Sequence, residues 1–131
     1  QHCKVLFNIT LSKLLNRKIT MLHSYKKYVK YRIKTPLPSY RQFPCVTPNF
    51  DNASRRMHKG FTAFIGSTPQ LYGKWLSSVF EKFKPYSQEE NFIFINAWNE
   101  WAEGNHLEPD QKWGRKYLEE TKKNIDQYKN R

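Results

Sequence analysis

The sequence is poor in cysteine and has no long apolar run. Among its 131 residues there are two cysteines, Cys3 and Cys45, and neither stands in a CxxC or Cys/His spacing, so no zinc site or disulfide framework is indicated. Because free thiols are typical of a reducing compartment, we expect a cytoplasmic protein. No stretch approaches the ~18 apolar residues of a membrane span, so the only membrane role left open is contact with its surface.

Acidic residues are also scarce. The chain has 23 Lys and Arg against 11 Asp and Glu, which gives a formal net charge of +12. Such a surface attracts phosphates, anionic lipid headgroups or acidic glycans. The basic residues are spread along the whole chain and form no known nucleic-acid-binding motif, so we expect no specific nucleic-acid partner. Peripheral contact with an anionic membrane stays open.

Binding motifs for cofactors and metals are missing as well. There is neither a glycine-rich phosphate loop nor a DxD metal motif, and we expect no cofactor. Glu103 and His106 form an ExxH pair, which in helix bundles is half of a di-iron site. Gly104 and Pro109 argue against the helix that this site requires, and no second copy exists. We therefore expect no metal site.

The apolar pattern predicts a succession of helices and extended runs. Apolar residues recur at helical spacing from Leu11 to Val29, which predicts one long amphipathic helix or two short ones. Short extended runs are expected near residues 44–50 and 61–66. The segment STP at 67–69 supplies a helix N-cap and a proline at the first helical position, so a helix is predicted over 69–83.

The most apolar segment is NFIFINAW, residues 91–98, which is apolar at odd and even positions alike. This is typical of a strand covered on both faces in a parallel α/β sheet. A last helix is expected to open at Pro109 and Asp110. The order of extended run, helix, apolar strand, loop and helix predicts βα units, whose functional groups follow the C-terminal ends of the strands.

The segment after this apolar strand, NEWAEG, contains two glutamates, Glu100 and Glu103. In a continuing strand they would point to opposite faces, whereas a helix or a tight turn brings them onto one side. Gly104 and Asn105 supply the turn chemistry for the second arrangement.

Such a carboxyl pair is suited to acid–base chemistry on sugars. Close to Trp98 and Trp101, the two groups would release their protons at different pH values, because partial burial and like charge disfavour the second ionisation. One could then act as an acid and the other as a base. Glycosidic bond cleavage needs such a pair, together with tryptophan faces against which a sugar ring packs.

These residues also resemble a known family. FINAWNEWAEGNHLEPD, at 94–110, resembles the C-terminal motif of WbsX-type proteins of bacterial surface-polysaccharide clusters, which are related to glycoside hydrolase family 99. TPNFDNASRR and FIGSTPQLYGKWL resemble two further WbsX segments, the first with Ala53 and Ser54 where the family usually has Thr and Pro. The resemblance is clearest over residues 44–118.

The resemblance implies a (β/α)8 barrel that acts on glycans in O-antigen or capsule biosynthesis. In the related hydrolases the first glutamate of this motif is the base on the sugar 2-hydroxyl, a role that falls on Glu100. The second is the acid/base for the departing oxygen and corresponds to Glu103, while Asn99 and Trp101 would line the site. Ala102 stands where the hydrolases have histidine. Hydrolase and glycosyltransferase both stay open, with a glycan or a lipid-linked oligosaccharide as substrate.

Two further residues are candidates for this pocket. Asp51 follows an extended run and could reach the pocket from a neighbouring strand end, or form a turn and pair with a nearby arginine. His106 is expected in a loop at the pocket rim. Arg55 and Arg56 could hold an acidic sugar or a phosphate, or simply solvate a loop.

The length of the chain limits how much of a barrel it can form. An eight-stranded barrel takes at least ~200 residues, and this chain has room for about three βα units. It also opens with Gln1 rather than Met. We therefore expect residues 1–131 to form an α/β fold that is the C-terminal portion of an incomplete (β/α)8 barrel. Two alternatives remain, a noncatalytic basic module that binds nucleic acid or an anionic membrane, and a sugar-binding protein without catalysis.

Overall fold

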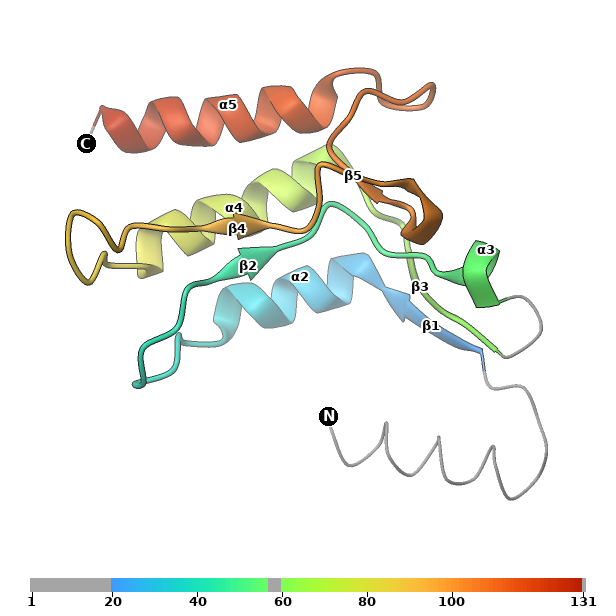
Figure 1. The fold of residues 1–131 in the computed structure, drawn as a ribbon, viewed down its shortest axis with the longest axis horizontal. Helices are drawn as coiled ribbons and strands as arrows, with labels where there is room; N and C mark the ends of the chain where they lie inside the picture. The colour runs from blue at the N-terminus through green and yellow to red at the C-terminus, as the bar shows by residue number, and fades with distance from the viewer. Residues whose placement is uncertain (1–19, 57–59, 131) are drawn as a thin grey trace.

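The computed structural model describes residues 20–56 and 60–130, which form a layer of helices against a layer of extended segments (Figure 1). The elements, in chain order, are β1 (Met21–Ser24), α2 (Tyr25–Lys34), β2 (Cys45–Val46), α3 (Ala53–Arg56), β3 (Thr62–Ile65), α4 (Pro69–Lys82), β4 (Phe94–Ile95), β5 (Asn99–Glu100), the 3-10 turn η1 (Trp101–Glu103), β6 (Asn105–His106) and α5 (Lys116–Lys129).

The extended segments pair in three places. Strands β1 and β3 are parallel, and so are β2 and β4, where Cys45 lies opposite Phe94 and Val46 opposite Ile95. Strands β5 and β6 form an antiparallel hairpin. Between β2 and β4 the chain passes through α3, β3 and α4, and β3 pairs with β1, so the strands that pair in the two parallel sheets are not consecutive in the chain.

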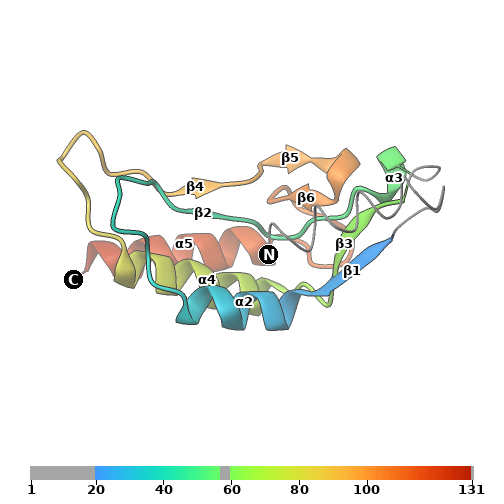
Figure 2. The same cartoon turned by 90° about the horizontal axis from the view of Figure 1, so that it is seen from below.

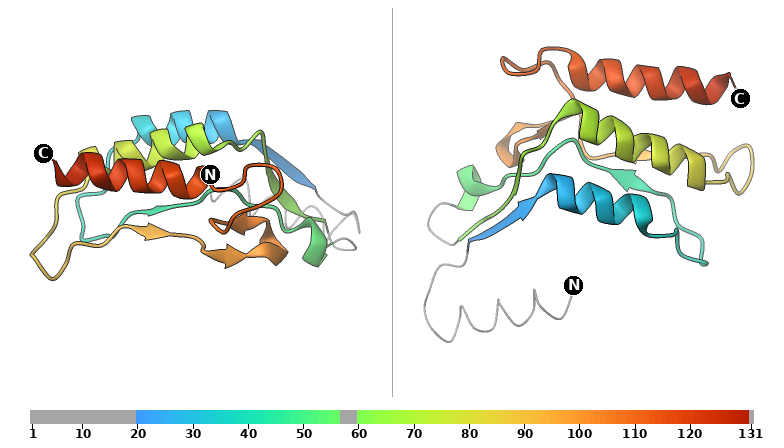
Figure 3. Two further views of the ribbon diagram at one scale, coloured as in Figure 1. Left: turned by 90° about the horizontal axis from the view of Figure 1, so that it is seen from above. Right: turned by 180° about the vertical axis from the view of Figure 1, so that it is seen from behind.

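The long helices all cover the same side of the strands. Figure 2 shows α2, α4 and α5 in one layer beneath β2 and β4, and Figure 3 shows α4 between the other two. The buried core lies between the layers and includes Tyr25, Val46, Tyr72 and Leu76. Burial raises the pKa of Tyr72 to about 12 and raises that of Tyr25 as well.

The predicted helix over 69–83 is confirmed as α4, and for the predicted reasons. The Thr68 side chain accepts a hydrogen bond from the Leu71 backbone N–H at 3.3 Å, and Pro69 occupies the first turn. The apolar face that follows packs into the core through Trp75 and Val79, among others. The predicted extended run at 61–66 likewise contains β3.

The predicted helix from Leu11 to Val29 is wrong over Met21–Ser24 and confirmed from Tyr25 onward. Residues 11–19 lie outside the described part of the chain. Met21–Ser24 form strand β1, because this segment pairs with β3, and helix α2 begins only at Tyr25. The Ser24 hydroxyl accepts from the Lys27 N–H and marks this start.

The last helix also begins later than predicted. Residues 110–114 form a turn in which the Gly114 N–H donates to the Asp110 carbonyl at 2.8 Å and the Asp110 carboxylate accepts from the Trp113 N–H. Gly114 has a φ of 54°, a conformation that interrupts a helix. Helix α5 therefore starts at Lys116.

The predicted burial of residues 91–98 on both faces is wrong within the described part of the chain. Ile93 and Ile95 pack against the core under the helices. On the opposite face Phe92, Phe94 and Trp98 are 50%, 54% and 53% exposed. Cys45, which lies opposite Phe94, is exposed on the same side. We call the surface formed by Phe92, Phe94, Trp98 and Cys45 the open face. No helix in the described ranges has both the length and the apolar character needed to cross a membrane.

Candidate active site

The two glutamates of NEWAEG come together at the end of the β4 segment. The chain passes through β5 into the single turn η1, and Gly104 ends that turn with a φ of 55°. Because of this turn, Glu100 and Glu103 face the same guanidinium group: Arg55 Nη1 lies 2.9 Å from Glu103 Oε1 and 3.9 Å from Glu100 Oε1. The tight-turn arrangement is thus the one present, and Arg55 lies at its centre.

A second segment of the chain holds this turn in place. The Asp51 N–H donates to the Glu103 carbonyl at 2.6 Å, and the Ser54 hydroxyl donates to the Ala102 carbonyl at 2.6 Å. A Cβ atom on Gly104 would lie 3.2 Å from the Asp51 Cβ, a tight contact that the glycine avoids. We call residues 51–55 the DNASR segment and the region around Glu100 and Glu103 the carboxylate site. The DNASR segment forms one side of the carboxylate site.

Asp51 contributes to the site through its backbone. Its carboxylate accepts a hydrogen bond from the Ala53 N–H at 2.8 Å, which caps the short helix α3. Asp51 thus lies beside the turn that carries the glutamates, and its side chain acts as a turn former. Its expected pairing with an arginine is absent from the described ion pairs, where Arg55 pairs with the two glutamates instead.

The tryptophans give the site exposed aromatic surface. Trp98 and Trp101 are 53% and 49% exposed. The Trp101 ring stacks on the His106 ring with centroids 3.7 Å apart, and its Nε1–H donates to Glu108 Oε2 at 2.6 Å. This hydrogen bond holds the indole in place. Asn99 lies opposite His106 in the β5–β6 hairpin and is exposed.

Asn105 is a residue whose role the sequence did not reveal. It reads as a turn former, yet it is fully buried. Its Oδ1 accepts from the Thr47 hydroxyl at 2.9 Å and from the Ala97 N–H at 3.0 Å. These bonds tie the hairpin to the segments that follow β2 and β4. Asn105 thereby fixes where NEWAEG sits relative to the parallel strands.

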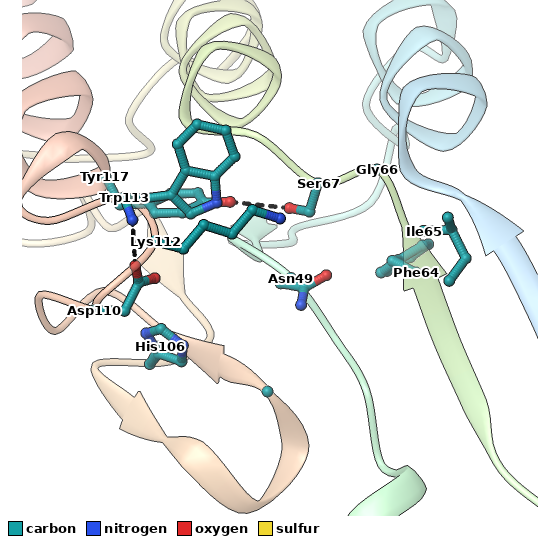
Figure 4. A pocket seen from close by; sticks show the side chains of 11 residues that line it. Asn49, Phe64, Ile65, Gly66, Ser67, His106, Asp110, Lys112, Trp113 and Tyr117 are labelled. Atoms are coloured by element: carbon teal, nitrogen blue, oxygen red, sulfur yellow. Dashed lines mark hydrogen bonds between the residues drawn. The ribbon is translucent and has the colours of Figure 1, made fainter.

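A pocket of about 290 Å³ lies on the other side of Gly104 (Figure 4). We call it the Trp113 pocket. His106 lines it, whereas neither of the two glutamates does. The other residues that line it include Asn49, Ser67, Gly104, Asp110, Lys112, Trp113 and Tyr117.

The ion pairs at the site orient side chains more than they stabilise the fold. The side chains of Arg55, Glu100 and Glu103 are 55%, 47% and 29% exposed, and exposed pairs typically contribute about 0.2–1 kcal/mol. One cation between two anions reduces the repulsion between the carboxylates and leaves a local charge of one negative unit. Residues 20–56 and 60–130 contain no cluster of three or more His, Cys, Asp or Glu placed to hold a metal ion.

Comparisons with known proteins cover most of the chain. The sequence profile of the family described as glycosyltransferase WbsX matches residues 2–121. The chain is 40% identical over 88 residues to a protein described as uncharacterized protein WxcX in two strains of Xanthomonas campestris pv. campestris. This match covers 66% of the chain and 12% of the WxcX protein, so the chain spans only a small part of that relative. No solved structure matches.

Proposed function

This chain belongs to the WbsX glycosyltransferase family, and we propose that it carries the acid–base pair of a site that makes or breaks glycosidic bonds in bacterial surface-polysaccharide biosynthesis. The observation that carries the proposal is the convergence of Glu100 and Glu103 on Arg55. Two carboxyl groups on one side of the chain, next to exposed indole rings, are the groups that glycosidic chemistry requires. The carboxyl groups follow the β4 segment, where βα folds place their functional groups.

The roles of the two glutamates follow from the resemblance. Glu103 would give a proton to the departing glycosidic oxygen, while Glu100 would act as base on the sugar 2-hydroxyl. Arg55 would hold both carboxylates at one place and limit their mutual repulsion. Trp101, held by Glu108 and stacked on His106, offers a fixed edge for a sugar ring.

We also propose that the chain forms part of a larger (β/α)8 barrel. In that fold neighbouring strands are parallel and helices cover one side of them, as they do for β2 and β4. In a barrel the strand face opposite the helices is filled by side chains from other strands, and this is the open face with Phe92, Phe94 and Trp98. Its closure would also remove water from the carboxylates, which strengthens their electrostatic interactions.

The test is a set of glutamine substitutions in the full-length protein. Glu103→Gln should abolish restoration of surface polysaccharide in a strain that lacks the gene, and should abolish conversion of the extracted polysaccharide, measured by mass spectrometry. Glu90→Gln is the matched control, because Glu90 forms a comparable exposed ion pair with Arg41 at 2.7 Å, outside the site. Wild-type activity of Glu103→Gln would remove the proposed role, and so would equal losses in both variants.

One difference from the related hydrolases favours a second candidate function, that of a sugar-binding protein without catalysis. Ala102 stands where the related hydrolases have histidine, so a donor that could contact the sugar is missing. In that case the wild-type protein would bind the extracted polysaccharide without converting it. Glu103→Gln would then leave both binding and polysaccharide production unchanged.

A further inference from the structure

The Trp113 pocket is built from three separate parts of the chain. The β6 hairpin contributes His106, the β3–α4 connection contributes Ser67, and the turn before α5 contributes Lys112 and Trp113. Figure 4 shows these side chains around one space, with Asn49 between the hairpin and β3. At about 290 Å³ the pocket is just below the ~300–1,000 Å³ typical of small-molecule sites, a size that suits a single sugar ring.

The cation in this pocket has no anionic partner. Lys112 Nζ lies 5.2 Å from the centre of the Trp113 ring, and no ion pair involves it within 20–56 and 60–130. Asp110 lines the same pocket, but its carboxylate accepts from the Trp113 N–H inside its own turn. A ligand that brings an anion to Lys112 would therefore gain a charge-assisted hydrogen bond without breaking an ion pair.

The pocket also presents uncharged polar groups. The Ser67 and Tyr117 hydroxyls are 3.1 Å apart and close one end of the pocket, where Ser67 also donates to the Pro48 carbonyl. The two hydroxyls suit the hydroxyls of a sugar, because a Ser or Tyr oxygen can accept a further hydrogen bond.

We propose that the Trp113 pocket binds a sugar residue that carries a carboxylate, with Lys112 as its counter-ion. Gly104 lines this pocket and directly follows Glu103, so the pocket adjoins the carboxylate site. If the proposed function holds, the pocket is a neighbouring subsite that selects an acidic residue of the glycan. The binding claim rests on the pocket itself and does not need the glutamates to be catalytic.

The test compares two probes and two lysine variants in the full-length protein. Methyl glucuronide and methyl glucoside differ only in the carboxylate, and their binding is measured by saturation-transfer NMR and calorimetry. The glucuronide should bind at least tenfold more tightly. Lys112→Met should remove this preference, while the Met side chain keeps the apolar contact with Trp113.

Lys116→Met is the matched control. Lys116 also lies over the Trp113 ring, at 5.9 Å, but does not line the pocket. It should keep the preference for glucuronide. Equal binding of the two probes by the wild type, absence of saturable glucuronide binding, or equal losses in both lysine variants would overturn the proposal.

The failure of this proposal can be told apart from the failure of the proposed function. Glu103→Gln should retain glucuronide binding with the Lys112-dependent preference. If glucuronide does not bind while Glu103→Gln abolishes conversion of the polysaccharide, the subsite proposal fails and the catalytic one stands. If glucuronide binds through Lys112 while Glu103→Gln stays active, the catalytic proposal fails and the subsite proposal stands.

Discussion

Replacing Gly104 by alanine tests whether the DNASR segment holds the carboxylate site together. A Cβ at residue 104 would lie 3.2 Å from the Asp51 Cβ, closer than comfortable contact, and the residue has a φ of 55°. Gly114 has nearly the same φ, 54°, but a Cβ there meets no atom within 4 Å. The two alanine variants therefore share the backbone strain and differ in the crowding of Asp51.

The expected losses of stability follow from the backbone strain and from the crowding of Asp51. The left-handed conformation costs a residue with a Cβ about 1–2 kcal/mol, which is the full expected effect of Gly114→Ala. Crowding in a packed contact adds about 1–3 kcal/mol, so Gly104→Ala should be worse by that amount. The crowding should weaken the 2.6 Å hydrogen bond from the Asp51 N–H to the Glu103 carbonyl. Arg55 would then be held less firmly beside the glutamates.

Hydrogen exchange followed by mass spectrometry on the full-length protein measures this cost locally. An added 1–3 kcal/mol corresponds to about 5- to 150-fold faster exchange. We expect this acceleration in Gly104→Ala for peptides that cover residues 51–56 and 100–105, together with a loss of activity. Gly114→Ala should show neither change in these peptides. Equal exchange and equal activity in the two variants would refute the docking of DNASR as the support of the site.

The remaining predictions concern the open face and the core. Cys45 is exposed on the open face, so closure of the barrel should protect its thiol. In the native full-length protein, Cys45 should react with N-ethylmaleimide far more slowly than in urea, as measured by peptide mass spectrometry. Fast labelling of the native protein would contradict closure. Burial raises the pKa of Tyr72 from 10.0 to about 12, so this residue's contribution to stability is complete below pH 10 and is lost as the pH rises towards 12. Tyr72→Phe should make the urea midpoint less dependent on pH in that range; an unchanged pH dependence would contradict it.

The sequence was sufficient wherever the signals are local. Helix α4 was predictable because Thr68 and Pro69 mark its start and an apolar face follows at helical spacing. The turn that brings the glutamates onto one side was predictable because Gly104 can adopt a positive φ. In both cases the residues that decide the conformation lie within a few positions of the element that they shape.

The rest depends on contacts between distant residues. Strand β1 carries a helical apolar pattern, but its pairing with β3, about forty residues away, overrides that pattern. Arg55 is 48 residues from Glu103, so no local spacing could identify it as the partner of the glutamates. Asn105 has the composition of a turn residue, and only the packing of the hairpin against Thr47 and Ala97 shows that it is buried.

If Glu100 and Glu103 work as one catalytic unit, a double-substitution cycle will show it. Conversion of the extracted surface polysaccharide is compared for Glu100→Gln, Glu103→Gln and the double variant of the full-length protein. Residues of one catalytic unit are strongly non-additive, so the double variant should be no slower than the slower single variant. Losses that multiply in the double variant, or single variants that retain wild-type turnover, would contradict the account.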